Sequence, residues 1–229
     1  MNIILNIDTA VDVASVSIAK DGEIMARASN SQQKDHGGFL QPAIASLLKD
    51  TGISIQELDA IAISAGPGSY TGLRVGMATA KGLCYALKKP LITINTLEIL
   101  ASAAISQFNE KSLKDSPLFC PMIDARRNEV FTAMYHQNLR EVLKPVALVL
   151  DQNSFAKSLL NSRVFFFGNG SEKWKLFCSS SNANFIELAD NHMAMSKLAD
   201  RLYRLDEFAD LAYSTPFYLK EFYTGPALK

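Results

Sequence analysis

The stretch Gly66-Pro67-Gly68-Ser69-Tyr70-Thr71-Gly72 separates two apolar segments and decides how both are interpreted. Residues 58–65 before it form a short apolar run, as in a buried strand. Residues 73–87 after it form a helix pattern that Pro90 ends, and residues 91–94 return to a strand pattern. Strand, glycine turn, helix and strand in this order predict a right-handed parallel crossover and a mixed α/β fold.

The segments before the crossover predict an antiparallel meander followed by a helix. Residues 3–7 and 14–19 are apolar or β-branched runs, and Asp21-Gly22 is a hairpin turn signal that leads into a third strand at residues 23–28. From Phe39 the apolar spacing changes to three and four, which indicates an amphipathic helix.

A polar segment at residues 107–117 is the best candidate for a linker, and it follows a predicted helix at residues 97–105. We therefore expect an N-terminal α/β lobe at residues 1–104 and a C-terminal α/β lobe at residues 105–229. The second lobe is expected to hold strands at residues 118–123, 129–135, 146–150 and 164–167, with helices at residues 154–160, 171–177 and 195–205.

Composition excludes several classes of function. The chain has 229 residues, with 23 Lys plus Arg against 23 Asp plus Glu, so no net charge draws it to a phosphate backbone. Its three cysteines lie too far apart for a metal pair and are odd in number, which favours a reducing cytoplasm. No charge-free apolar run reaches about 18 residues, so we expect no membrane span.

The glycine stretch has two chemical interpretations. Free N–H groups at a helix start would seat an anion, with Gly66, Gly68, Ser69 and Thr71 as contacts, whereas the alternative is a purely structural tight turn. The spacing matches neither a P-loop nor a dinucleotide fingerprint nor a nucleophile elbow. Asp8-Thr9, after the first strand, is open to the same choice between a phosphate or metal contact and a simple turn.

The helix at residues 73–87 is apolar or small on nearly every side, which indicates burial on two faces. Gly76 and Ala80 would let a second helix approach closely, and Met77 would supply an adaptable contact. An ordinary central helix and a helix between subunits are equally compatible with this pattern.

The remaining polar motifs have simpler explanations. Residues 124–129 (DARRNE) are either an ion-pair network or, through Arg126 or Arg127, a phosphate contact. The turn at residues 167–171 indicates helix capping. The three histidines match no metal motif, so we expect no metal site.

Several of these segments together resemble one family, the TsaB (YeaZ) family, the dimerisation subunit of the bacterial tRNA threonylcarbamoyladenosine-forming complex. The segments are Ile7-Asp8-Thr9, the helix start at His36, residues 66–74 (GPGSYTGLR), residues 124–131 (DARRNEVF) and residues 216–220 (PFYLK). The chain departs from the family pattern at His36-Gly37-Gly38, where the family commonly has His-Ser-Glu, and at Lys220, where Arg is usual. The first change removes a hydroxyl and a carboxylate at the start of the first helix.

The resemblance implies the two-lobed fold of actin, sugar kinases and heat-shock ATPases, with a degenerate nucleotide site. It implies a noncatalytic scaffold for a metal-containing, TsaD-type paralogue, which transfers threonylcarbamoyl from its adenylate to N6 of the adenosine next to the anticodon. The other implied partners are a small TsaE-type ATPase and a second copy of the chain, with tRNA bound mainly through the complex. The resemblance implies no tightly bound cofactor. It does allow ADP or ATP to bind at the subunit interface.

The same resemblance implies that the first two helices bind the paralogue. The predicted interface residues are Phe39, Leu40, Ile44, Leu47, Leu48, Leu73, Gly76, Met77, Ala80 and Leu83. The alternative function is a nucleotide phosphotransferase or ATPase of the same fold, with Asp8, Thr9 and the turn at residues 168–170 lining its cleft. Against it, residues 124–126 read Asp-Ala-Arg where such enzymes carry Asp-x-Gly.

Overall fold

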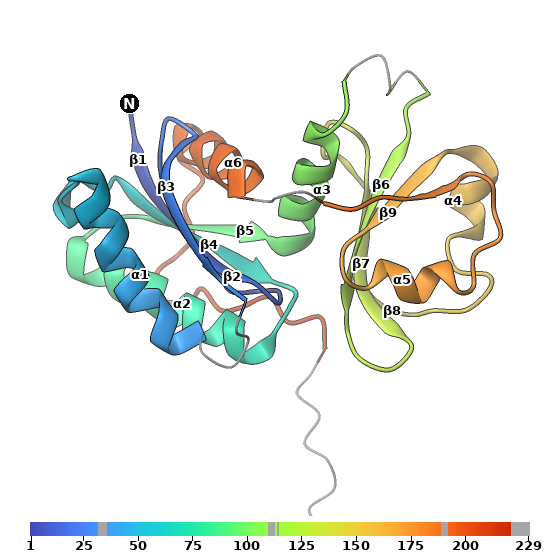
Figure 1. The fold of residues 1–229 in the computed structure, drawn as a ribbon, viewed down its shortest axis with the longest axis horizontal. Coiled ribbons are helices and arrows are strands. Elements are labelled where there is room, and N and C mark those ends of the chain that lie inside the picture. Colours follow the sequence, from blue (N-terminus) through green and yellow to red (C-terminus); the bar gives the residue numbers. More distant parts are fainter. Residues whose placement is uncertain (32–35, 110–112, 114, 189–191, 221–229) are drawn as a thin grey trace, which may run out of the picture.

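The chain folds into two lobes that lie side by side (Figure 1). The computed structural model describes residues 1–31, 36–109, 113, 115–188 and 192–220. Each lobe is built on a five-stranded sheet, and together they form the mixed α/β fold that the sequence predicts.

The first sheet combines a meander with a parallel crossover. Its strands are β1 (Ile3–Asp8), β2 (Ala14–Lys20), β3 (Glu23–Asn30), β4 (Ala60–Gly66) and β5 (Leu91–Asn95). The spatial order is β3-β2-β1-β4-β5, with β1, β2 and β3 antiparallel and β4 parallel to both β1 and β5. The predicted meander and the predicted parallel crossover are both confirmed.

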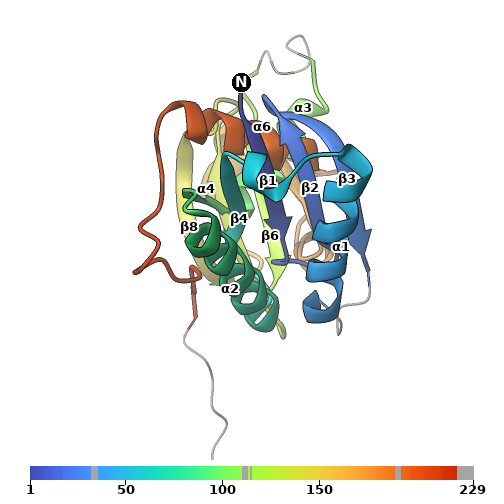
Figure 2. The ribbon, with the colours of Figure 1, turned by 90° about the vertical axis from the view of Figure 1, so that its left-hand side faces the viewer.

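Helices cover both faces of this sheet. On one face lie α1 (His36–Thr51) and α2 (Tyr70–Leu87), next to each other (Figure 2). On the other face lie α3 (Thr96–Ser106) and α6 (His192–Arg204). Successive side chains of a strand point to opposite faces, so the central strands β1 and β4 are buried and apolar along most of their length.

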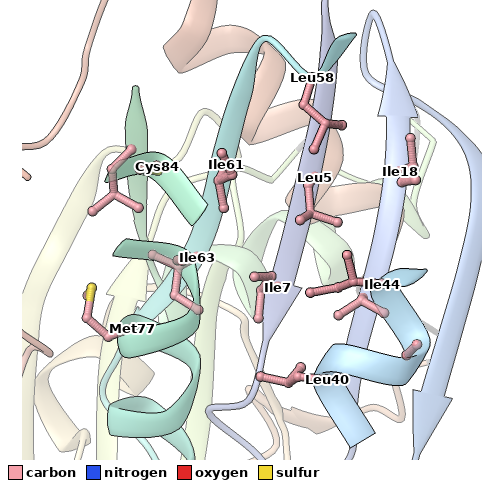
Figure 3. Packing of buried hydrophobic residues seen from close by; sticks show 14 of the residues in the cluster. Leu5, Ile7, Ile18, Leu40, Ile44, Leu58, Ile61, Ile63, Met77 and Cys84 are labelled. Atoms are coloured by element: carbon pink, nitrogen blue, oxygen red, sulfur yellow. The ribbon is translucent and has the colours of Figure 1, made fainter. Parts of the chain in front are cut away.

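The core beneath α1 and α2 is made of aliphatic side chains. Leu5 and Ile7 of β1 pack against Leu40 and Ile44 of α1, which point toward the sheet (Figure 3). Met77 of α2 belongs to the same buried cluster. Burial of one such side chain contributes roughly 1.5–3 kcal/mol of gross transfer free energy, so each of them helps to stabilise the lobe.

The second lobe repeats the topology of the first. Its strands are β6 (Leu118–Asp124), β7 (Glu129–Tyr135), β8 (Glu141–Val149), β9 (Val164–Phe167) and β10 (Ala183–Phe185). The order is β10-β9-β6-β7-β8, with antiparallel β6-β7-β8 beside parallel β6, β9 and β10. The short helices α4 (Ala156–Asn161) and α5 (Ser171–Lys175) belong to this lobe, where Trp174 packs against Phe155 and Phe166.

Helix α3 packs against both lobes, and helix α6 returns the chain from the second lobe to the first. Ile99 of α3 packs into the core of the first sheet, whereas Leu97 and Leu100 pack into the core of the second. Helix α6 follows the second sheet in sequence and yet returns to the first sheet, where Leu198 is buried. All strands before residue 105 belong to the first sheet and all later strands to the second, but α6 packs on the first sheet. The lobe boundary near residue 105 therefore stays a prediction.

Several element limits differ from the sequence prediction. Helix α2 begins at Tyr70 rather than residue 73, because Ser69 caps it and the second half of the glycine stretch is already helical. Strand β8 begins five residues before the expected start, and β10 was not predicted. Within the described residues, no helix is both long enough and apolar enough to cross a membrane.

Candidate functional site

The glycine stretch turns sharply from β4 into α2. Ser69 is the N-cap of α2, and its hydroxyl accepts a hydrogen bond from the Gly72 N–H at 3.3 Å. The Ser69 N–H donates to the carbonyl of Ala10 at 2.7 Å, so the turn is bonded to the loop after β1.

The glycines of this turn are explained by close backbone packing. A Cβ atom on Gly68 would lie 2.1 Å from the Ala10 carbonyl oxygen, and one on Gly72 would lie 2.0 Å from the Thr9 carbonyl oxygen. Gly66 adopts a φ of +115°, which L-residues rarely adopt. These contacts support the tight-turn interpretation, and an anion at the turn stays a prediction.

Asp8, at the end of β1, and Thr9, in the loop that follows, are both buried. Their exposed fractions are 3% and 0%. The Asp8 carboxylate accepts hydrogen bonds from the Ser64 hydroxyl at 2.6 Å and from the Ala10 N–H at 3.1 Å, and the Thr9 hydroxyl donates to the Gly72 carbonyl at 2.7 Å. Asp8 thus links the end of β1 to β4, and Thr9 links the following loop to the start of α2, while a contact of either residue with a nucleotide stays a prediction.

A cavity of about 740 Å³ lies between the lobes, near the start of α2. Of the predicted contacts, Gly68, Ser69 and Thr71 line it, whereas Gly66, Asp8 and Thr9 do not. The second lobe contributes Arg126 and Asn169 among others. Its size falls within the range of small-molecule sites.

A polar network crosses this cavity. The Asn169 side-chain amide donates to the Asp12 carboxylate at 2.9 Å, and its carbonyl oxygen accepts from the Asp124 N–H at 2.8 Å. Asp124 also accepts from Lys173 and from the Arg126 N–H, both at 2.6 Å. Although partial burial opposes it, this pair of hydrogen bonds lowers the pKa of Asp124 below its ordinary value.

Sequence reasoning identified only part of this lining. Asn169 and Arg126 were considered, but Asp12 and the C-terminal residues 217–220 were not linked to the cavity. A weak signal for the C-terminal segment existed, since Phe217 and Tyr218 are aromatic residues that follow the last predicted helix. No cluster of three or more metal-ligating side chains occurs in the part of the chain that the structure describes.

Comparison with known proteins places this geometry in a family. A family model described as TsaD, tRNA N6-adenosine threonylcarbamoyltransferase, matches residues 23–217. TsaB of Bacillus subtilis, a tRNA threonylcarbamoyladenosine biosynthesis protein, is 30% identical over 225 residues, which are 95% of this chain and 93% of that protein. The chain belongs to the TsaB (YeaZ) family.

Two further comparisons agree with the family. A threonylcarbamoyltransferase of Novosphingobium aromaticivorans is 49% identical over 76 residues, which are 33% of this chain and only 20% of that protein. YeaZ from Pseudomonas aeruginosa has the same fold, with a TM-score of 0.78 at 23% identity, covering 96% of this chain and 100% of that structure. The α/β fold with two mixed five-stranded sheets is thus shared with a solved YeaZ structure, as expected for this family.

Most of the residues expected to bind a partner of this TsaB-family chain lie in its own core. Phe39, Leu48 and Leu83 are half-buried against the core cluster. The others are buried: Leu40, Ile44, Leu47, Leu73, Gly76, Met77 and Ala80. The apolar side chains of α1 and α2 cover the sheet, and their contact with a partner stays a prediction. That the two helices bind a partner stays a prediction.

The outer face of α2 carries a row of small side chains. Ala78, Gly82 and Ala86 are exposed, four residues apart, and therefore form one row along the helix. A Cβ on Gly82 would meet nothing within 4 Å. Tyr85, with an exposed fraction of 81%, stands beside this row. Helix α1 adds exposed Gln41 and Ala45, together with other polar or small residues.

Proposed function

We propose that this chain is a noncatalytic scaffold subunit in tRNA threonylcarbamoyladenosine biosynthesis. In this proposal it binds a TsaD-type, metal-containing paralogue through the outer faces of α1 and α2 and positions that subunit for transfer of threonylcarbamoyl to N6 of adenosine. Family membership supports the pathway, and the observation that carries the scaffold role is the row of small exposed residues on α2.

This row favours a helical partner for a physical reason. The distance between two packed helix axes, 8–10 Å, depends on the side chains at their contact, so small residues permit the closest approach. Ala78 and Gly82 leave the backbone of α2 accessible, and Tyr85 supplies an aromatic ring of the type that anchors interfaces.

The noncatalytic role is supported by the position of Asp8. In an enzyme of this fold, the carboxylate at the end of the first strand would have to reach the ligand. Here it is 3% exposed and hydrogen-bonded to Ser64 within its own lobe. Asp8 is also not among the residues that line the interlobe cavity, which supports the noncatalytic role over the alternative.

The interface is tested by Ala78→Glu, measured as binding of the TsaD-type subunit by calorimetry. A carboxylate forced into a helix–helix contact loses its hydration without a partner, so we expect binding to weaken by at least about tenfold, or about 1.4 kcal/mol. The matched control is Ala156→Glu, the same change at an exposed alanine of α4 in the other lobe. Unchanged binding by Ala78→Glu would overturn the assignment of this face.

Both variants should fold normally, because both alanines are exposed. Charged substitutions at Leu47 or Met77 would be unsuitable, since these side chains are 4% exposed and a charge there would unfold the lobe.

The proposal extends to the other components expected from the family. A small TsaE-type ATPase would complete the complex, a second copy of this chain would occupy the same face in the paralogue's absence, and tRNA would be bound mainly by the assembled complex in the cytoplasm. A net charge of zero agrees with leaving tRNA capture to the partners.

A nucleotide phosphotransferase is the second candidate, favoured by the size of the interlobe cavity. Calorimetry with ATP and magnesium distinguishes the phosphotransferase from the scaffold. The scaffold proposal assigns no tightly bound cofactor to the isolated chain and places ADP or ATP at the junction of two subunits, so heat of binding should appear only with the complex. Micromolar binding of ATP by the isolated chain would favour the enzyme.

A further inference from the structure

Residues 205–220, here called the C-terminal strap, leave the end of α6 and run along the first lobe to the space between the lobes (Figure 1). The strap contains no helix or named strand, apart from an isolated bridge between Ala209 and Leu91. Its position is set by a series of specific contacts.

The first half of the strap is fastened to the edge of the first sheet and to α2. The Ala209 N–H donates to the carbonyl of Leu91 on β5 at 2.8 Å. The Lys81 ammonium group of α2 donates to the carbonyls of Ala212 at 3.1 Å and Ser214 at 2.9 Å. Three hydrogen bonds thus hold this half against one lobe, two of them from a charged donor.

The second half passes directly over the glycine turn. The Phe217 N–H donates to the Ala65 carbonyl at 2.7 Å, and a Cβ on Gly66 would lie 2.6 Å from the Phe217 carbonyl oxygen. The next ring, Tyr218, lies 5.2 Å from that of Tyr70 at the start of α2. Gly66 is therefore required by the strap as well as by its own φ.

The strap then crosses to the second lobe. The Lys220 ammonium group forms an ion pair with the Glu129 carboxylate of β7. The exposed fractions of these side chains are 41% and 17%, so the pair is partly open to solvent. Residues 217–220 line the interlobe cavity, which places the strap along one side of it.

We propose that the C-terminal strap is a latch, in which the Lys220–Glu129 ion pair holds the lobes closed over the interlobe cavity and its release lets them separate. The strap is bonded to the first lobe at several points and to the second through an ion pair at its end. A partly solvated ion pair is a weak and reversible link, as a latch requires. Helix α3, packed into both cores, is the element about which the lobes would turn.

The test measures the distance between the lobes by double electron–electron resonance on the full chain. Spin labels are attached to cysteines introduced at Lys49 of α1 and Lys157 of α4, both exposed, after replacement of Cys178 by serine. In Lys220→Glu the paired charges repel, and the distance distribution should gain a longer population. Glu129→Lys should do the same, and the double variant, which restores an opposite pair, should return to the original distribution.

Lys175→Glu is the control, because this lysine pairs with Glu172 inside α5, away from the cavity. It should leave the distribution unchanged. Identical distributions for the chain with the native pair and for both single variants would overturn the latch, as would a double variant that remains as open as the singles. Circular dichroism melts of all variants separate lobe opening from unfolding.

Discussion

Replacement by alanine should change the free energy of unfolding in opposite directions at Gly76 and Gly82, two glycines of α2. In the interior of a helix, Gly→Ala contributes about 0.8–1.0 kcal/mol of stability from propensity. Gly82 is exposed and a Cβ there meets nothing within 4 Å, so Gly82→Ala should show the whole gain in the free energy of unfolding.

Gly76 is six residues earlier and faces the sheet. A Cβ there would lie 2.3 Å from the Thr9 hydroxyl oxygen and 2.9 Å from a methyl group of Ile63. Overpacking of this kind costs about 1–3 kcal/mol, and displacing the Thr9 hydroxyl breaks its bond to the Gly72 carbonyl, which costs about 1 kcal/mol more. After the propensity gain is subtracted, Gly76→Ala should lose about 1–3 kcal/mol.

Urea unfolding of the two variants, followed by far-UV circular dichroism, measures the change in the free energy of unfolding for each. The expected difference between them is about 2–4 kcal/mol, well above the error of such extrapolations. A Gly76→Ala variant as stable as Gly82→Ala would refute the close packing of α2 on Thr9 and Ile63.

Two further predictions concern titratable groups. Despite partial burial, hydrogen bonds from Lys173 and the Arg126 N–H lower the pKa of Asp124, so its ionised form stabilises the fold above the ordinary value of 3.8 and this contribution is lost as the pH falls through the lower, folded value. Lys173→Ala should raise the pKa of Asp124 in an NMR titration, and an unmoved pKa would contradict the cause given. Burial raises the pKa of the Cys84 and Cys120 thiols to about 12, so a thiol reagent at mildly alkaline pH should modify only Cys178 in the folded chain and all three cysteines in urea.

The sequence predicted the fold well where local patterns are strong. Strands β7 and β9 were placed at their observed limits, and the crossover around the glycine turn was identified, because apolar runs and glycines act locally. Strand β10 has three half-buried residues and no comparable pattern, so it was missed. The return of α6 to the first sheet depends on contacts far apart in sequence, which no local pattern encodes.

The candidate site was predicted less well. Apolar residues such as Leu47 and Met77 were expected at an interface, but an apolar residue on a helix carries no sign of whether it faces its own sheet or another protein. The row at Ala78 and Gly82 was not predicted, since small residues on a helix are informative only once their exposure is known. Asp8 was predicted as a contact because it is an acidic residue at the end of the first strand, and its bond to Ser64, 56 residues away in sequence, follows from no local pattern.

Reconstituted tRNA threonylcarbamoylation tests the scaffold role most directly. The reaction with the TsaD-type subunit, the TsaE-type ATPase, threonylcarbamoyl-adenylate and tRNA is run without this chain, with the native chain, with Ala78→Glu and with Ala156→Glu. We expect modification only with the native chain and Ala156→Glu, with Ala78→Glu failing at concentrations where it no longer binds its partner. Equal modification without the chain, or with Ala78→Glu, would contradict a scaffold that acts through the outer face of α2.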